Sequence, residues 1–179
     1  GLRLASRGYQ VTFVEKADQP GGRLNRLTKD GFTFDVGPSF FSMPYEFDEL
    51  VKDCGINMPF EFVEIEPLYT VNFKGSDKKY ALYKDIDKLS KQFEAVEPDF
   101  KLKFTAYLKK CETIYHDTVD IAIKQNFNSI PAYLLALASV NPLHLPLLLR
   151  TFWKQTGIYF KSKEARQIVS LIAFSLGRT

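Results

Sequence analysis

One acidic residue and one diglycine bend near the amino terminus have the types and spacing needed to hold a nucleotide. Glu15 closes the short run Val11 to Val14, and the bend Gly21-Gly22-Arg23 begins six residues later. An acid at the carboxyl end of a buried strand can accept two hydrogen bonds from a ribose diol. Two glycines let backbone N–H groups approach a phosphate or ribityl chain, and Arg23 adds a cation. The expected ligand is an adenosine-containing cofactor.

These groups require particular elements around them. The pattern predicts a helix over Leu2 to Arg7 with Leu4 and Ala5 packing inward, and Gly8 fits the left-handed residue that ends many helices. Val11 to Val14 is then interpreted as the second strand of a dinucleotide-binding fold. Its phosphate-binding glycine turn and its first, paired strand are expected before residue 1. We therefore interpret the sequence as an internal piece of a longer protein.

The segments after the bend predict a hairpin and a helix. Leu24 to Leu27 and Phe32 to Val36 flank a turn at Lys29-Asp30-Gly31, and Gly37-Pro38 breaks the second strand. Pro44 to Cys54 has apolar residues at helical spacing and Gly55 directly after it, which indicates a short helix.

The period of the apolar residues changes near residue 60. Alternation at Tyr69 to Phe73 and Lys79 to Tyr83 predicts two antiparallel strands, and the pattern is helical from Ile86 to the end. The longest helix is expected to bury one face, formed by Phe100, Phe104, Leu108, Cys111 and Tyr115. We predict an α/β protein with a partial Rossmann-like nucleotide-binding domain at 1–60 and a partial mixed-sheet and helical substrate domain at 61–179.

Composition excludes several classes of protein. The 179 residues are 45% hydrophobic and 25% charged, which is typical of a soluble globular protein, and the net charge is +3. No block of like charges supports nucleic-acid binding. Cys54 and Cys111 lie far apart without metal-ligand spacing, so we expect reduced cytosolic thiols and neither a disulfide nor a metal site.

Three stretches together resemble a known family. GLRLASRGYQVTFVEKADQPGGRLNRL, GFTFDVGPSFFSMP and, more loosely, ARQIVSLIAFSLG are similar to the FAD-dependent phytoene desaturases of bacterial type. These belong to the wider flavin-dependent group that includes monoamine oxidases and carotenoid isomerases. The resemblance covers most of the chain, and the Gly37-Pro38-Ser39-Phe40 stretch favours the carotenoid branch.

The resemblance implies FAD as cofactor and a place for each candidate residue. It puts Glu15, with Lys16 next to it, at the adenosine ribose, and Gly21, Gly22 and Arg23 along the pyrophosphate and flavin side. The segment Gly37, Pro38 and Ser39 would lie close to the isoalloxazine ring. The implied reaction is desaturation of an apolar polyene such as phytoene, with the cofactor performing the difficult chemistry. We expect residues 1–179 alone to bind FAD weakly and to be inactive.

No residue in the sequence stands out as a catalytic base. His116 lies within the long helix and His144 lies among apolar residues, so both are interpreted as structural. The alternatives left open are a carotenoid isomerase, a hydroxycarotenoid desaturase, an amine oxidase, and a non-enzymatic lipid-binding protein on the same fold, as in Rab GDP-dissociation inhibitors.

The leucine-rich stretch from Ile130 to Leu149 raises the question of a membrane. Asn141-Pro142 and Pro146 interrupt it, so two short helices are expected in place of a membrane span. They either form the wall of a core or channel, or they dip into a bilayer interface with Arg150, Trp153 and Lys154 at headgroup level. The expected location is the cytoplasm, with peripheral docking on the cytoplasmic membrane under the second interpretation.

Overall fold

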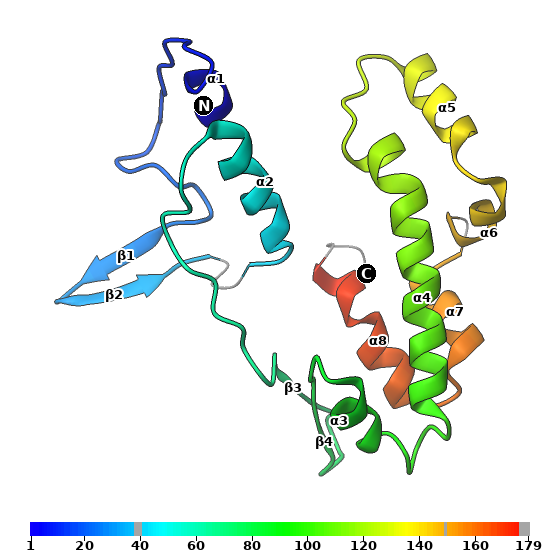
Figure 1. The fold of residues 1–179 in the computed structure, drawn as a ribbon. Helices are drawn as coiled ribbons and strands as arrows, with labels where there is room; N and C mark the ends of the chain where they lie inside the picture. The colour runs from blue at the N-terminus through cyan, green and yellow to red at the C-terminus, as the bar shows by residue number, and fades with distance from the viewer. Residues whose placement is uncertain (38–40, 149, 176–179) are drawn as a thin grey trace. The chain divides into compact units, whose positions relative to one another are not determined.

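The chain divides into two compact units, Gly1–Glu64 and Ile65–Thr179 (Figure 1). A computed structural model describes residues 1–37, 41–148 and 150–175. Helices and two small antiparallel sheets make up its regular structure. The combination agrees with the mixed α/β composition expected from the sequence.

The first unit begins with the short helix α1, Leu2–Ala5. Gly8 ends the helical turn at φ 83°, and its N–H donates to the Ala5 carbonyl while the Tyr9 N–H donates to the Leu4 carbonyl. The predicted terminator is therefore confirmed. The predicted inward packing is wrong, because Leu4 is 51% exposed and Ala5 is exposed as well.

The strand predicted at Val11 to Val14 is not formed. The segment has no strand pairing, and the side chains of Phe13 and Val14 are 79% and 95% exposed. A strand is defined by hydrogen bonds to a neighbour, and within the described residues no strand lies beside this run. The apolar pattern alone could not supply that partner.

The predicted hairpin is confirmed, but its first strand lies two residues later than the predicted Leu24 to Leu27 and includes Lys29, which was expected in the turn. Strands β1, Arg26–Lys29, and β2, Phe32–Asp35, pair antiparallel with Lys29 opposite Phe32. Asp30 and Gly31 connect them with φ values of 53° and 83°. Two successive positive φ values are those of a type I′ turn, which matches the right-handed twist of the strands.

Helix α2, Pro44–Cys54, completes the first unit with the predicted bounds. Pro44 occupies its first turn, and Gly55 ends it in the left-handed conformation at φ 64°. Phe47 lies in a cluster of rings with Phe41, Phe60 and Phe62, at centroid distances of 5.1, 6.2 and 5.8 Å. Arg3 donates two hydrogen bonds to Asp53 and so ties α1 to α2.

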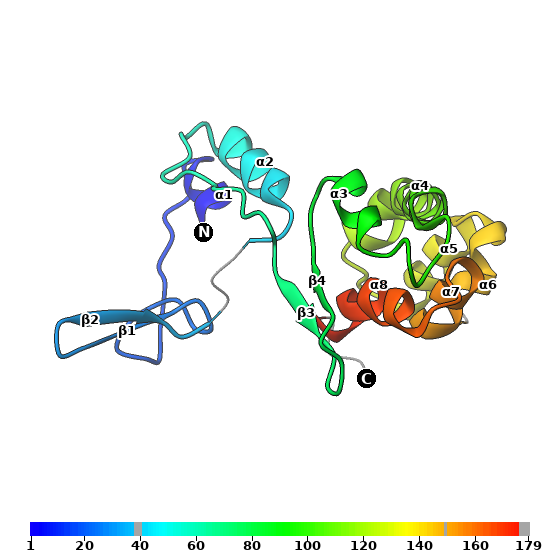
Figure 2. The same ribbon diagram turned by 90° about the horizontal axis from the view of Figure 1, so that it is seen from below.

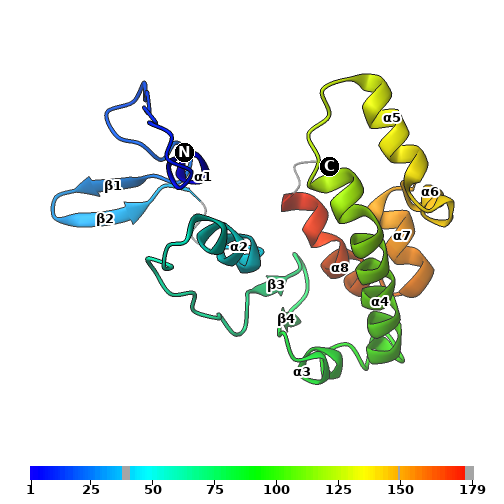
Figure 3. The same ribbon diagram turned by 45° about the horizontal axis from the view of Figure 1, so that its top comes forward.

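The second unit contains one hairpin and a set of helices, as the sequence predicted. Strand β3, Thr70–Asn72, pairs with β4, Lys79–Ala81. The helical elements that follow are α3 Ile86–Lys91, α4 Phe100–Thr118, the π-helix η1 Val119–Ile123, α5 Ile130–Ser139, the 3-10 helix η2 Pro142–His144, α6 Leu145–Leu148, α7 Phe152–Tyr159 and α8 Lys163–Ser175. Figures 2 and 3 show α7 and α8 beside α4.

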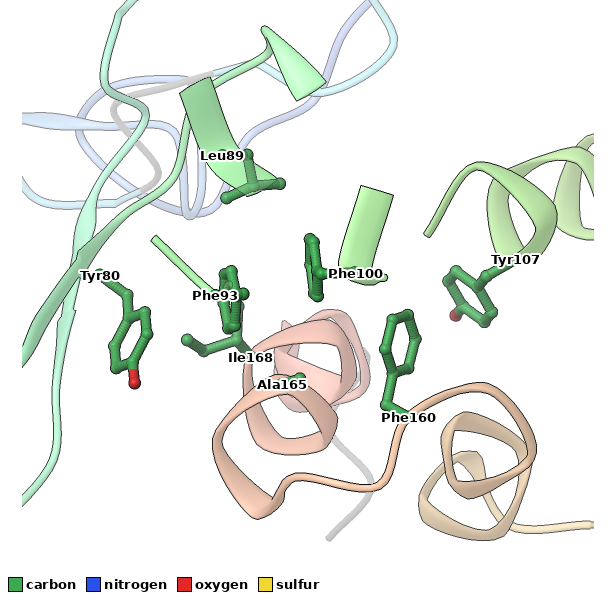
Figure 4. Close-up of a cluster of buried hydrophobic side chains, with 8 residues drawn as sticks. All are labelled: Tyr80, Leu89, Phe93, Phe100, Tyr107, Phe160, Ala165 and Ile168. Atoms are coloured by element: carbon green, nitrogen blue, oxygen red, sulfur yellow. The ribbon is translucent and has the colours of Figure 1, made fainter. Parts of the chain in front are cut away.

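Stacked aromatic rings form the core of the second unit (Figure 4). Phe93 and Phe100 are nearly parallel with centroids 4.1 Å apart, Tyr80 stacks on Phe93 at 4.9 Å, and Phe160 lies 5.5 Å from Phe100. These rings come from β4, the α3–α4 connection, the start of α4 and the end of α7. Burial of such large apolar surfaces is the main stabilising contribution available to this unit.

The buried face of α4 differs from the predicted one. Phe100 is buried and Phe104 and Tyr115 are half-buried, but Leu108 is 39% exposed and Cys111 is exposed. Tyr107 is buried in their place. Both faces of α4 carry apolar residues, so its sequence pattern could not decide which one meets the core.

A buried carboxylate joins the α3–α4 connection to the start of α8. Glu97 has no exposed surface, and its Oε2 accepts hydrogen bonds from the backbone N–H groups of Lys161 and Ser162 at 2.7 and 2.6 Å. The Lys103 ammonium pairs with Oε1. Burial by itself raises the pKa of Glu97, but the bonds from Lys103, Ser162 and Lys161 outweigh it and lower this pKa.

Candidate nucleotide site

The diglycine bend has a backbone that requires glycine. Gly21 has φ 125° and Gly22 has φ 55°, and the Leu24 N–H donates to the Gly21 carbonyl at 2.9 Å. A Cβ on Gly21 would lie 2.7 Å from the Leu24 carbonyl oxygen, whereas a Cβ on Gly22 would meet no described atom within 4 Å. The bend is thus tight on the inside and open around Gly22, where a ligand can approach the backbone.

The hairpin brings the end of β2 back to this bend. The Val36 N–H donates to the Asn25 carbonyl at 3.0 Å. Beyond that bond, Gly37 packs so closely on the bend that a Cβ there would lie 1.7 Å from the Arg23 carbonyl oxygen. Two of the predicted site segments, 21–23 and Gly37, therefore lie together. Pro38 and Ser39 fall outside the described residues.

Glu15 and Lys16 lie on the exposed loop that leads into the bend. Glu15 Oε1 accepts a hydrogen bond from the Ala17 N–H at 2.9 Å, which fixes the side chain over a local turn. Further along the loop, the Gln19 amide donates to the Arg26 carbonyl at 3.0 Å and fastens the loop to β1. Gln19 was not a sequence candidate, and no motif distinguishes it from an ordinary loop residue.

This group of residues fits the phosphate and ribose part of a dinucleotide. Glu15 presents an exposed carboxylate, Gly22 has open space where a side chain would otherwise stand, and Gly37 leaves room for the Arg23 backbone. Both glycines have positive φ, a backbone conformation that residues with a side chain rarely adopt. This set of groups can bind a nucleotide, and among its described residues no nucleophile is paired with a base.

The second unit contains a polar pair that the sequence did not reveal. The His144 ring is 3% exposed, and its Nε2 lies 2.7 Å from Asp117 Oδ2. His144 Nδ1 is buried and has no hydrogen-bond partner within the described residues. The two residues are 27 positions apart, so no local spacing predicts their contact. His116, the other histidine, is exposed.

The remaining polar features do not form a second site. Cys54 is half-buried and Cys111 is exposed, and both are free thiols. Across the described residues there is no group of three His, Cys, Asp or Glu side chains arranged to hold a metal ion. In the same part of the chain, no helix is long and apolar enough to cross a bilayer.

Comparison with known proteins identifies the family. Residues 1–145 match the family described as flavin containing amine oxidoreductase. The chain belongs to this family. Flavin, as FAD, is accordingly its cofactor, and the open diglycine bend and the Glu15 carboxylate fall within the matched residues. The resemblance noted in the sequence is therefore confirmed at the level of the family.

Phytoene desaturases are among the curated proteins that this chain resembles, as three of them show. The Fusarium fujikuroi phytoene desaturase is 31% identical over 184 residues, covering 98% of this chain and 31% of the relative. The Phycomyces blakesleeanus phytoene desaturase is 33% identical over 178 residues, covering 98% and 30%. The Myxococcus xanthus zeta-carotene-forming phytoene desaturase is 33% identical over 135 residues, covering 74% and 26%. The chain thus spans about a third of the length of these relatives.

Proposed function

We propose that this chain is part of an FAD-dependent oxidoreductase that desaturates a carotenoid precursor such as phytoene. The observation that carries the proposal is the extent of the match: the similarity to fungal phytoene desaturases covers 98% of the chain and so includes both compact units. A likeness restricted to the nucleotide site would support only flavin binding. The likeness of the second unit extends the proposal to the substrate.

Each candidate residue has a role in this proposal. Glu15, with Lys16 beside it, binds the adenosine ribose, and Gly21, Gly22 and Arg23 bind along the pyrophosphate. Gly37, with Pro38 and Ser39, lies next to the flavin ring. The close packing of Gly37 on Arg23 supports this set, because it joins the two segments that would contact neighbouring parts of one cofactor. When bound, FAD would supply the oxidising power: it would take a hydride from an allylic C–H of the polyene while the neighbouring carbon loses a proton, which forms the new double bond.

The two units correspond to two partial domains in this proposal. The first contributes part of a Rossmann-like FAD-binding domain, and the second contributes part of the substrate domain. The sequence boundary, 1–60 against 61–179, lies four residues from the division between the compact units after Glu64. Aromatic and leucine side chains in the second unit suit a long apolar substrate.

The decisive experiment supplies phytoene to the complete gene product that contains this chain. Pigments are then separated by HPLC. We expect products with additional conjugated double bonds. Phytoene recovered unchanged from a protein that carries flavin would contradict the proposal, and a product altered only in double-bond geometry would favour the isomerase alternative.

We further propose that α5 docks on a membrane surface, from which an extremely apolar substrate must be taken up. Three side chains of α5 are exposed although they are fully apolar: Ile130 at 75%, Leu134 at 58% and Leu135 at 73%. Trp153 is 41% exposed, and Arg150 and Lys154 are exposed beside it. Exposed apolar side chains on one helix, in a unit that also exposes an indole and two cations, are suited to the headgroup boundary.

Sedimentation with liposomes tests this docking in the full-length protein. Leu135→Asp combined with Leu134→Asp should move the protein from the pellet to the supernatant. Leu102→Asp is the matched control, because Leu102 on α4 is 74% exposed but lies on a different helix. Equal sedimentation of the α5 variant and the control would exclude α5 as the docking surface.

A further inference from the structure

The segment from Phe127 to His144, here called the α5 arm, is weakly held along most of its length. It contains α5 and η2 and lies beside α4 in Figures 1 and 3. Phe127 packs edge-on against Tyr133 within the arm, with ring centroids 5.2 Å apart. The buried side chains of the arm are Val140 and His144, both at its distal end. Segments with few buried apolar contacts open at low free energy.

One hydrogen bond, between a buried imidazole and a partly exposed carboxylate, ties the distal end of the arm to the body of the unit. His144 Nε2 meets Asp117 Oδ2 at 2.7 Å, and Asp117 lies on the last turn of α4. The imidazole is 3% exposed. Removing the Asp117 carboxylate leaves the buried imidazole without a partner at either nitrogen within the described residues, which costs more free energy than the net gain from an ordinary surface contact. This bond therefore has a large influence on where the arm lies.

The other end of the arm begins at an irregular helical turn. Helix α4 continues into the π-helix η1, Val119–Ile123, which the Lys124 N–H closes by donating to the Val119 carbonyl at 2.8 Å. Helix α5 packs against η1. Short π-helical turns interrupt the regular hydrogen-bond ladder, are frequent at functional sites and are places where a helix bends. The arm thus has a natural hinge at its start and a polar attachment at its end.

We propose that the α5 arm is a strap that swings about η1 and is latched against α4 by the Asp117–His144 hydrogen bond. A role for the strap in turnover rests on the proposed desaturase function: there the strap gates the path of the apolar polyene. The latch, meaning the Asp117–His144 hydrogen bond, is part of the fold and can be tested without catalytic activity. Helix α5 has 10 residues, which is too short for an isolated helix to be stable in water. Its amides therefore lose protection when the strap is released.

Hydrogen exchange in the full-length protein tests the latch. In Asp117→Ala and in His144→Ala, exchange at 130–144 should become about tenfold faster, as expected for the loss of one charge-assisted or neutral hydrogen bond to the buried imidazole. Exchange in the first three turns of α4 should stay the same. Exchange at 130–144 in the double variant should be no faster than in either single variant, because each single variant already removes the same hydrogen bond. His116→Ala and Asp120→Ala are the matched controls, since these neighbours are exposed.

Three results would overturn the latch: unchanged exchange at 130–144, an equal increase across α4, α7 and α8, or additive effects in the double variant. Should the alanine variants fail to fold, Asp117→Leu removes the acceptor oxygen while keeping a side chain of similar size at this partly exposed position. Faster exchange confined to the arm in that variant supports the latch, and any other pattern contradicts it. Pigment analysis is separate, so loss of the proposed activity and loss of the latch are distinguishable.

Discussion

At the scale of single residues, Glu97 shows how a buried charge can organise a unit. Its carboxylate has no exposed surface, yet it receives the Lys161 and Ser162 N–H groups and the Lys103 ammonium. The backbone donors lie at the start of α8, where the partial positive charge of a helix favours an anion. A desolvated carboxylate is tolerable only with this complete set of partners.

Glu97→Gln should lower the free energy of unfolding by about 2 kcal/mol or more at neutral pH, because the Lys103 ammonium loses its buried counter-charge. Chemical denaturation of the purified chain measures the change. Glu94→Gln is the control, since Glu94 is exposed in the same connection, and its effect should stay within about 0.5 kcal/mol. Equal midpoints for the two variants would show that the Glu97 network does not stabilise the unit.

The same residue predicts a pH dependence. Because the folded-state pKa of Glu97 is lowered, its stabilising contribution is complete above the unfolded-state pKa of about 4.3 and is lost as pH falls through the folded-state pKa. The stability difference between the native protein and Glu97→Gln should therefore be constant from pH 7 to pH 5. It should shrink as the solution becomes more acidic. A difference that grew on acidification would contradict the lowered pKa.

At the scale of elements, local capping decides where the short helices begin. Helix α3 has six residues, and the Asp85 carboxylate accepts hydrogen bonds from the Asp87 and Lys88 N–H groups at 2.8 and 3.1 Å. These two backbone bonds lower the pKa of Asp85. Asp99 directly precedes α4, and its side chain makes no such capping hydrogen bond. The short helix therefore depends on its cap more than the long one does.

Asp85→Ala should make the amides of α3 exchange severalfold faster, because two backbone donors lose their acceptor. Amide exchange resolved by residue measures this. The control is Asp77→Ala in the β3–β4 loop, an exposed acid of the same type. If α3 exchanges at the same rate in both variants, the cap does not hold the helix.

The elements that the sequence predicted well are those with complete local signals. Helix α2 begins at Pro44 and ends before Gly55, and the β1–β2 hairpin turns at Asp30-Gly31. The prediction of a strand at Val11 to Val14 was wrong because a strand needs a neighbouring strand, which no run of four residues can specify. The predicted buried face of α4 was wrong because Tyr107 and Leu108 are both largely apolar, and only packing decides which of them is buried.

The candidate site was predictable to the same extent. Glu15 and the diglycine bend could be named because acid type, glycine and spacing are local properties of the sequence. The contact between Gly37 and Arg23 depends on the hairpin geometry, and the Asp117–His144 bond joins residues far apart in the sequence. Apolar composition around His144 indicated a structural role but gave no means of finding its partner.

At the scale of the whole chain, the two units differ in how much surface they bury. The fully buried apolar side chains of the described residues, from Tyr80 to Ile168, all lie in the second unit. In the first unit no described residue is fully buried. Because stability in water depends mainly on buried apolar surface, the second unit is expected to be the more stable one.

Limited proteolysis of the 179-residue chain should therefore degrade residues 1–64 first and leave a resistant fragment that begins near Ile65. Mass spectrometry of the surviving fragments gives their ends. Survival of an intact 1–64 fragment after the rest has been digested would reverse the predicted order.

The central claim concerns the nucleotide end of the flavin and is tested most directly by measuring bound FAD. Gly22 and Gly55 both have positive φ, 55° and 64°, and a Cβ on either would meet no described atom within 4 Å. An alanine therefore strains both positions alike, by about 1 kcal/mol, but only Gly22 lies in the proposed phosphate bend.

The measurement is the molar ratio of FAD to protein in the purified full-length product, for the native sequence, Glu15→Ala combined with Gly22→Ala, and Gly55→Ala. We predict about one FAD per native chain, a similar ratio for Gly55→Ala, and at least a tenfold lower ratio for the combined variant after dialysis, as expected when interactions worth 1.4 kcal/mol or more are lost. An undiminished ratio in the combined variant would contradict the account.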